Sequence, residues 1–132
     1  MGEFGEFLGW VTAVFFGVAV LNFFVKRINK MYISKLPKES SVKKYYIMLM
    51  KIIVKYHRWF GMGAGAIVLI HMPVQIFGEY ASVTGIAAAV LLVLTALLGI
   101  IMYFGHKPNL VKVHRVVCAL AVIALIVHLL FH

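Results

Sequence analysis

Long apolar runs alternate with short charged stretches along this chain, and the runs approach or reach the length of a membrane span. A transmembrane helix needs roughly 20 predominantly apolar residues to cross a hydrocarbon core about 30 Å thick. The four runs cover residues 7–25, 59–77, 81–104 and about 113–131, and Arg115 is the charged residue among them, near one edge of the fourth. Backbone groups in lipid must be hydrogen-bonded within the segment, and no alternating polarity is present, so the runs predict helices. We therefore expect an all-α, four-helix transmembrane bundle.

The expected helices form a single membrane domain over residues 1–132. Basic and amphipathic residues before the second run extend that helix, and short connections separate the others. The helices are expected over about residues 7–25, 45–77, 81–105 and 110–131, with a basic loop over residues 26–44.

Composition excludes several other classes of protein. The chain is 64% apolar and 13% charged, whereas soluble domains are about a quarter charged, so a soluble enzyme is excluded. Cys118 is the single cysteine and lies inside an apolar run, which excludes a disulfide scaffold. The four acidic residues lie outside the spans, so paired-carboxylate and Ser-His-Asp sites are not predicted.

The net charge of +9 is distributed on one side of the expected membrane. Ten of the thirteen cations lie from Lys26 to Arg58, and the other three lie from Lys107 to Arg115. Basic loops of membrane proteins stay in the cytoplasm. We therefore expect both basic connections in the cytoplasm and both termini outside, in a plasma membrane.

The stretch from Lys43 to Lys55 alternates cations with apolar residues at near-helical spacing. Such a segment is typical of an interfacial helix whose lysines extend toward lipid headgroups. Attraction to anionic lipid explains it, and docking of an acidic soluble partner is the alternative. A nucleic-acid partner is disfavoured because the basic groups lie against a bilayer.

Four of the six histidines form two pairs with one spacing. His57 and His71 are fourteen residues apart, as are His114 and His128. Fourteen residues at about 100° each fall within about 40° of four full turns, so each pair shares a helix face, with roughly 21 Å between its members. A lone membrane histidine is often only a hydrogen-bonding group between helices. Two equally spaced pairs on two helices favour a shared binding role instead.

The second and fourth helices are expected to run in the same direction, from the cytoplasm outward. His57 and His114 then lie at one depth, the inner site, and His71 and His128 at another, the outer site. Two facing imidazoles at each depth are suited to two six-coordinate haems bound between the helices. The four histidines are therefore the candidate iron ligands.

Small and cationic residues accompany the histidines. Small residues leave room for a porphyrin, and arginines next to the inner histidines can neutralise haem propionates. The candidate cofactor-contacting residues are Arg58, Arg115, Gly61, Ala64, Gly65 and Ala121. Gly61 and Gly65 also form a small-xxx-small pair that helix packing alone explains. The glycine-rich segment follows no expected strand, so it is not a dinucleotide loop.

The pattern His57-x13-His71 with His114-x13-His128 resembles the diheme core of the membrane cytochromes b, including the respiratory cytochrome b core and ferric-reductase-like transmembrane domains. The local strings beginning at Tyr56 and Val113 are most similar to the latter. The resemblance covers roughly residues 56–128. It implies two b-type haems ligated by the four histidines, and electron transfer across the membrane.

These observations predict a diheme b-type cytochrome, with quinol or redox proteins on either face as candidate partners. Any oxidoreductase activity, quinol- or ferric-reductase-like, would be exercised with such partners. Two alternatives are a metal or proton transporter lined by histidines, and an accessory subunit without catalytic activity. His106 and His132 fall outside the two pairs and are expected at the surface.

Overall fold

The computed structural model describes residues 2–78 and 80–131, and within them it contains four long helices and no strand. Met1, Glu79 and His132 lie outside the described residues. The helices are α1 (Gly2–Met31), α2 (Ser41–Phe77), α3 (Val83–Gly105) and α4 (Val111–Phe131), with short 3-10 helices η1 (Ile33–Lys35) and η2 (Pro108–Leu110). The all-α, four-helix prediction is confirmed.

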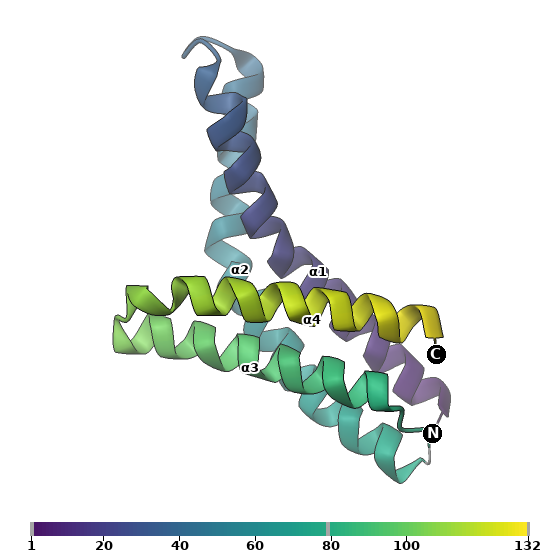
Figure 1. The fold of residues 1–132 in the computed structure, drawn as a ribbon. Coiled ribbons are helices and arrows are strands. Elements are labelled where there is room, and N and C mark those ends of the chain that lie inside the picture. Colours follow the sequence, from purple (N-terminus) through teal and green to yellow (C-terminus); the bar gives the residue numbers. More distant parts are fainter. Residues whose placement is uncertain (1, 79, 132) are drawn as a thin grey trace.

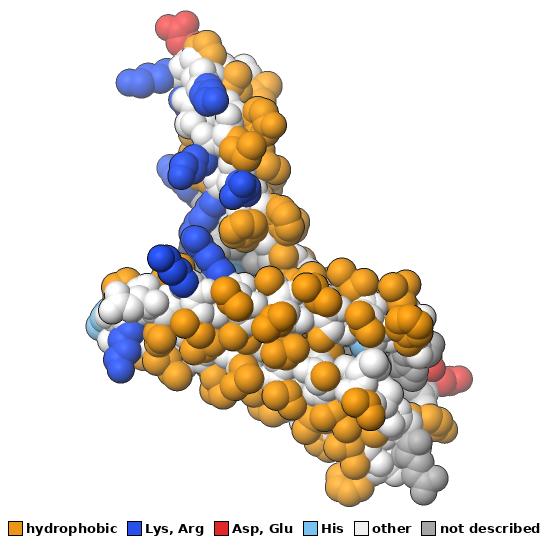
Figure 2. Space-filling view, viewed as in Figure 1, with side chains coloured by type: hydrophobic (Ala, Val, Ile, Leu, Met, Phe, Trp, Pro, Cys, Tyr) orange, Lys and Arg blue, Asp and Glu red, His pale blue; other side chains and the backbone are white. Residues whose placement is uncertain are grey.

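All four helices are long and apolar enough to cross a membrane. Large apolar side chains remain exposed along α3 and α4 and cover much of the visible surface (Figure 2). Exposed apolar surface of this extent is unusual for a soluble monomer and is expected where lipid replaces water. The architecture is therefore compatible with an integral membrane protein.

The first two helices extend further than the sequence pattern indicates. α1 begins at Gly2 and continues to Met31, and α2 begins at Ser41, so much of the expected 26–44 loop is helical. Lys26 and Lys30, and likewise Phe24 and Ile28, are separated by one helical turn, which favours helix over loop. The Tyr46 hydroxyl donates a hydrogen bond of 2.7 Å to the carbonyl of Val25 and joins the two helices.

α1 packs along α2, α3 packs along α4, and α2 packs against α3. The two termini lie at one end of the α3–α4 pair, and the connection between α3 and α4 lies at the other (Figure 1). The end of α1 and the start of α2 leave this bundle together and project from α3 and α4 as a helical hairpin. We call residues 23–55 the basic arm.

Small residues allow the helices to approach closely in the core. A Cβ at Gly65 of α2 would lie 3.1 Å from Cβ of Ala96 of α3, and a Cβ at Gly63 would lie 2.8 Å from the Phe15 ring of α1. Ala64 between them is fully buried. The buried core comprises Phe16, Ala64, Val68, Ala89, Leu92 and Ala121.

Replacing Ala64 with leucine is expected to destabilise the protein by about 1–3 kcal/mol, because the larger side chain has no space in a filled core. Thermal unfolding in detergent measures the effect as a lower midpoint. Ala66→Leu is the matched control, because Ala66 is exposed on the same helix. Equal midpoints for the two variants would contradict the close packing around Ala64.

Polar residues lie at both ends of α3, Ser82 at its start and His106 at its end. The Ser82 hydroxyl caps the helix by accepting a 3.1 Å hydrogen bond from the backbone N–H of Gly85. His106 ends the helix in the left-handed conformation, with φ of 49°, the position that glycine most often occupies. Its side chain is exposed, as the sequence predicts.

Candidate functional site

His57 of α2 and His114 of α4 face one another across the interior of the bundle. Their ring centroids are 6.4 Å apart and their planes are nearly perpendicular, at 89°. With metal–nitrogen distances of about 2 Å, as in imidazole–zinc bonds, two trans imidazoles on one metal have centroids roughly 6 Å apart. The distance between the two rings at the inner site therefore fits two imidazoles that would hold a single iron.

A backbone contact orients the His57 ring. Nδ1 of His57 lies 2.8 Å from the carbonyl oxygen of Ala19 on α1. A carbonyl oxygen only accepts hydrogen bonds, so Nδ1 carries the proton and Nε2 retains its lone pair. Histidines that bind metals usually donate their other ring N–H to a carbonyl or carboxylate in this way. His57 thus has the tautomer that a ligand through Nε2 requires.

His114 is held more loosely. The backbone of Thr95 lies near this ring, but Nδ1 is buried and forms no hydrogen bond of normal geometry with the described residues. A Cβ at Gly99 of α3 would lie 3.3 Å from Cε1 of the ring, so Gly99 leaves the space the imidazole occupies. An unsatisfied buried polar group costs about 1–3 kcal/mol. The space left by Gly99 therefore accommodates the His114 ring, and its Nδ1 atom adds no stabilising hydrogen bond.

The two rings border a cavity of about 230 Å³ to which all four helices contribute. Gly61 lies on its wall, and a Cβ there would meet no atom within 4 Å. The lining is otherwise almost entirely apolar, which suits a porphyrin face. Other lining residues include Phe16, Ala19, Met62, Leu92, Gly99 and Cys118.

The two inner arginines differ in position. Arg58 lines the inner cavity, and its guanidinium carbon lies 4.1 Å from the centroid of the Tyr103 ring. Arg115 is exposed outside the cavity and lies 5.9 Å from the centroid of the Phe23 ring. Arg58 is therefore the cation that the structure places against the inner site.

His71 and His128 border a second cavity of about 90 Å³. The Nδ1 atom of His128 lies 3.4 Å from the Ser82 hydroxyl and 3.3 Å from the Thr84 hydroxyl. Both hydroxyls belong to the start of α3, so that end of the helix positions the outer ring. The predicted pair of outer histidines therefore shares one cavity.

Glycines also lie against the outer histidines. A Cβ at Gly9 of α1 would lie 3.1 Å from Cε1 of His71, and a Cβ at Gly85 of α3 would lie 3.0 Å from Cε1 of His128. Each ring therefore occupies space that a side chain at the neighbouring position would fill. Gly85 and Gly99 are fourteen residues apart, the same spacing as the histidine pair of α4. That repeat is a signal in the sequence that our prediction missed, whereas nothing local identifies the Ala19 carbonyl.

The small residues predicted to contact a cofactor separate into two groups. Gly61 lines the inner cavity and Ala121 lines the outer one. Ala64 and Gly65 line neither of these cavities. Ala64 is part of the buried core, and Gly65 contacts α3 through Ala96. For Gly65 the helix-packing alternative is the one that matches its surroundings.

The two cavities differ in their fit to a haem. Small-molecule pockets commonly have volumes of about 300–1,000 Å³, so the inner cavity of about 230 Å³ is near this range, and the outer cavity of about 90 Å³ is well below it. The inner site fits a haem in the spacing of its two histidines, the tautomer of His57 and the apolar lining of its cavity. The outer site supplies the two histidines, but a porphyrin there requires the helices to separate.

Over residues 2–78 and 80–131, no three His, Cys, Asp or Glu side chains are arranged so that they could hold one metal ion. Histidine pairs are thus the candidate metal ligands in this part of the chain. His106 lies apart from both pairs, at the end of α3. His132, the other histidine expected at the surface, is outside the described residues. Comparisons with protein families, curated proteins and solved structures give no match to this chain.

Proposed function

We propose that this protein is a diheme b-type cytochrome that carries electrons across a membrane. The observation that supports this most directly is the inner pair, in which His57 and His114 face each other at 6.4 Å and the Ala19 carbonyl orients His57. When bound, haem supplies one-electron oxidation and reduction at its iron. The second haem, held by His71 and His128, is proposed from the shared outer cavity and the repeated spacing.

The residues of the chain would bind and orient these groups. His57 and His114 would hold the inner haem through their ring nitrogens. Arg58 lines the inner cavity and would pair with a propionate by charge-assisted hydrogen bonds. Leu92 of α3 lines both cavities, so the two sites are neighbours separated by little protein. This proximity supports direct electron transfer between them.

We also propose an orientation and partners. The positive-inside rule places the basic connections in the cytoplasm and both termini outside, in a plasma membrane. The inner site then lies toward the cytoplasm. Quinol, or redox proteins on either face, would donate and accept electrons at the two sites.

Purified protein loaded with haem tests this proposal. We expect b-type bands in a reduced-minus-oxidised spectrum and about two haems per chain. In vesicles with trapped ferricyanide, an external impermeant reductant should reduce it only when the vesicles contain the haem-loaded protein. Vesicles with haem-free protein are the control. A folded protein that takes up no haem would refute the proposal.

One observation favours a second candidate, a proton or metal transporter. Glu6 lines the outer cavity together with His71 and His128, so one cavity holds an acid and two titratable rings. Such groups are typical of proton and ion pathways in membranes. Haem-free protein in vesicles that hold a pH-sensitive dye separates the candidates, since only a transporter should move protons or metal without haem.

A further inference from the structure

Helices α1 and α2 are longer than a membrane span requires, and the basic arm is the part that exceeds it. At 1.5 Å per residue, α1 with 30 residues and α2 with 37 residues extend about 45 Å and 55 Å, against a hydrocarbon core of about 30 Å. α3, with 23 residues, extends about 35 Å and matches the core. The excess length of α1 and α2 is the arm, and it projects from the α3–α4 pair instead of running alongside it (Figure 1).

Each helix of the arm has one cationic and one apolar stripe. On α2, Lys44, Lys51 and Lys55 recur at positions i, i+7 and i+11, which lie within about 40° of one another around the helix. The apolar stripe also follows helical spacing and is exposed. The exposed fractions of Tyr45, Leu49 and Ile52 are 70%, 53% and 48%.

α1 repeats this division. Lys26 and Lys30 are exposed one turn apart, and Phe24, Ile28 and Met31 are exposed on another side of the helix. The space-filling view shows cations along one side of the arm and apolar side chains along the opposite side (Figure 2). The arm is therefore an amphipathic ribbon of two helices.

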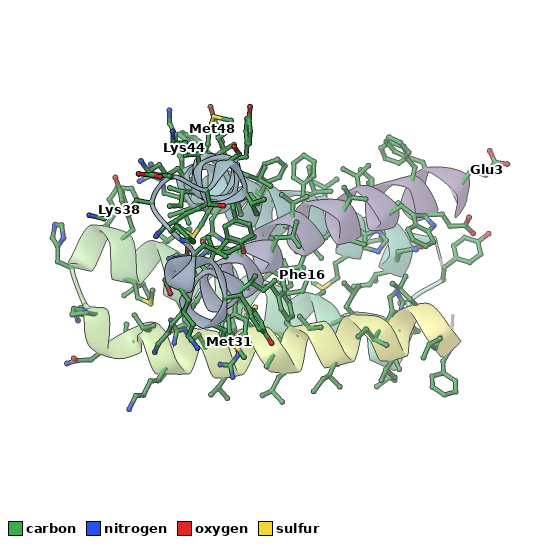
Figure 3. The ribbon with its side chains drawn as sticks, turned by 90° about the horizontal axis from the view of Figure 1, so that it is seen from above. Glu3, Phe16, Met31, Lys38, Lys44 and Met48 are labelled. Carbon is green, nitrogen blue, oxygen red and sulfur yellow. The ribbon has the colours of Figure 1, made fainter. Side chains whose placement is uncertain are left out.

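The cationic and apolar sides of the arm face opposite ends of the α3–α4 pair, as expected if α3 and α4 cross the membrane. The cationic side faces the same way as the end of the bundle that holds the α3–α4 connection, and the apolar side faces the end with the termini (Figures 1 and 2). Seen along the arm, Lys38 and Lys44 lie toward the end of the molecule opposite Glu3 (Figure 3). Arg115 of α4 lies beside Phe23, where the arm begins, and adds a cation at that level.

We propose that the basic arm lies flat on an anionic membrane surface and binds acidic phospholipid headgroups. Its apolar side enters the boundary of the acyl chains, and its lysines lie at headgroup level. The arm, residues 23–55, has nine cations and one acid, Glu39, which complements a negative surface. Each lysine or arginine near such a surface contributes about a fivefold factor in association. This inference does not depend on haem binding.

Two spin labels, at Leu49 and Lys51, test the proposal on the full-length protein. The two positions are about 160° apart on α2, and both are exposed. Leu49→Cys and Lys51→Cys are made separately in a Cys118→Ala background, so each protein carries one label. The labelled proteins are placed in vesicles of phosphatidylglycerol with phosphatidylcholine, or of phosphatidylcholine alone.

In vesicles with phosphatidylglycerol, we expect the label at position 49 to collide with oxygen dissolved in lipid and to be shielded from a water-soluble nickel chelate. The label at position 51 should collide mainly with the chelate. In phosphatidylcholine alone, the label at position 49 should become several-fold more accessible to the chelate. Raising the salt concentration to 1 M, where the Debye length is about 3 Å, should likewise make the label at position 49 more accessible to the chelate.

A charge-reversed arm is the second variant. Lys44→Glu, Lys51→Glu and Lys55→Glu together, with the label at position 49, should expose that label to the chelate even with phosphatidylglycerol. The matched Lys→Arg triple variant should leave it shielded. Circular dichroism shows whether the reversed protein remains helical, and if it does not, the salt series on the native arm decides. Chelate access at both positions with phosphatidylglycerol would overturn the proposal and favour an acidic soluble partner.

Discussion

Replacing His57 with leucine is expected to reduce the haem content from about two to about one per chain, because leucine has no lone pair for iron. His114→Leu should give the same result, since both rings serve one site and lie 6.4 Å apart. The double variant should therefore lose no more than either single one. The pyridine haemochrome assay measures the content, and low-temperature spectra distinguish the haem that remains.

His71→Leu completes this set at the outer site. We expect it to remove the outer haem and leave the inner one, so that its residual spectrum differs from that of His57→Leu. His106→Leu is the matched control, because His106 is exposed at the end of α3 and belongs to neither pair. Unchanged haem content in His57→Leu, or identical residual spectra for His57→Leu and His71→Leu, would show that our pairing is wrong.

Gly99→Leu is expected to remove the inner haem without changing a ligand. A Cβ at this position would already lie 3.3 Å from Cε1 of His114, and the rest of the leucine side chain would displace the ring. A displacement of about 1 Å is enough to disrupt a binding site, so His114 would no longer hold the inner haem. Haem content should fall to about one per chain, with the outer spectrum retained.

Gly85→Leu tests the same argument at the outer site, where a Cβ would lie 3.0 Å from Cε1 of His128. This variant should lose the outer haem and keep the inner one. Gly17→Leu is the control, because a Cβ there meets no atom within 4 Å. If the Gly99 and Gly85 variants matched Gly17→Leu in haem content, the glycines would not be positioning the histidines.

The number and nature of the helices could be predicted because the information is local. An apolar run near 20 residues predicts a membrane helix wherever it lies in the chain. The helices of the basic arm were harder to predict. The residues from Lys26 onward are charged, as loop residues often are, but their apolar positions also recur with helical spacing. The structure shows that this segment is helical, because α1 continues to Met31.

The sequence alone determined the spans, their relative direction and the two levels of histidines, because apolar length, loop charge and helical spacing are properties of single segments. It also determined that His57 and His114 should meet. The tertiary structure decided which atoms surround the rings. The Ala19 carbonyl reaches His57 across 38 positions in the chain, and Gly99 faces His114 from another helix. Such contacts depend on the rotation and separation of packed helices, and no local pattern specifies these. The packing of the helices also determines that the basic arm projects from α3 and α4 (Figure 1).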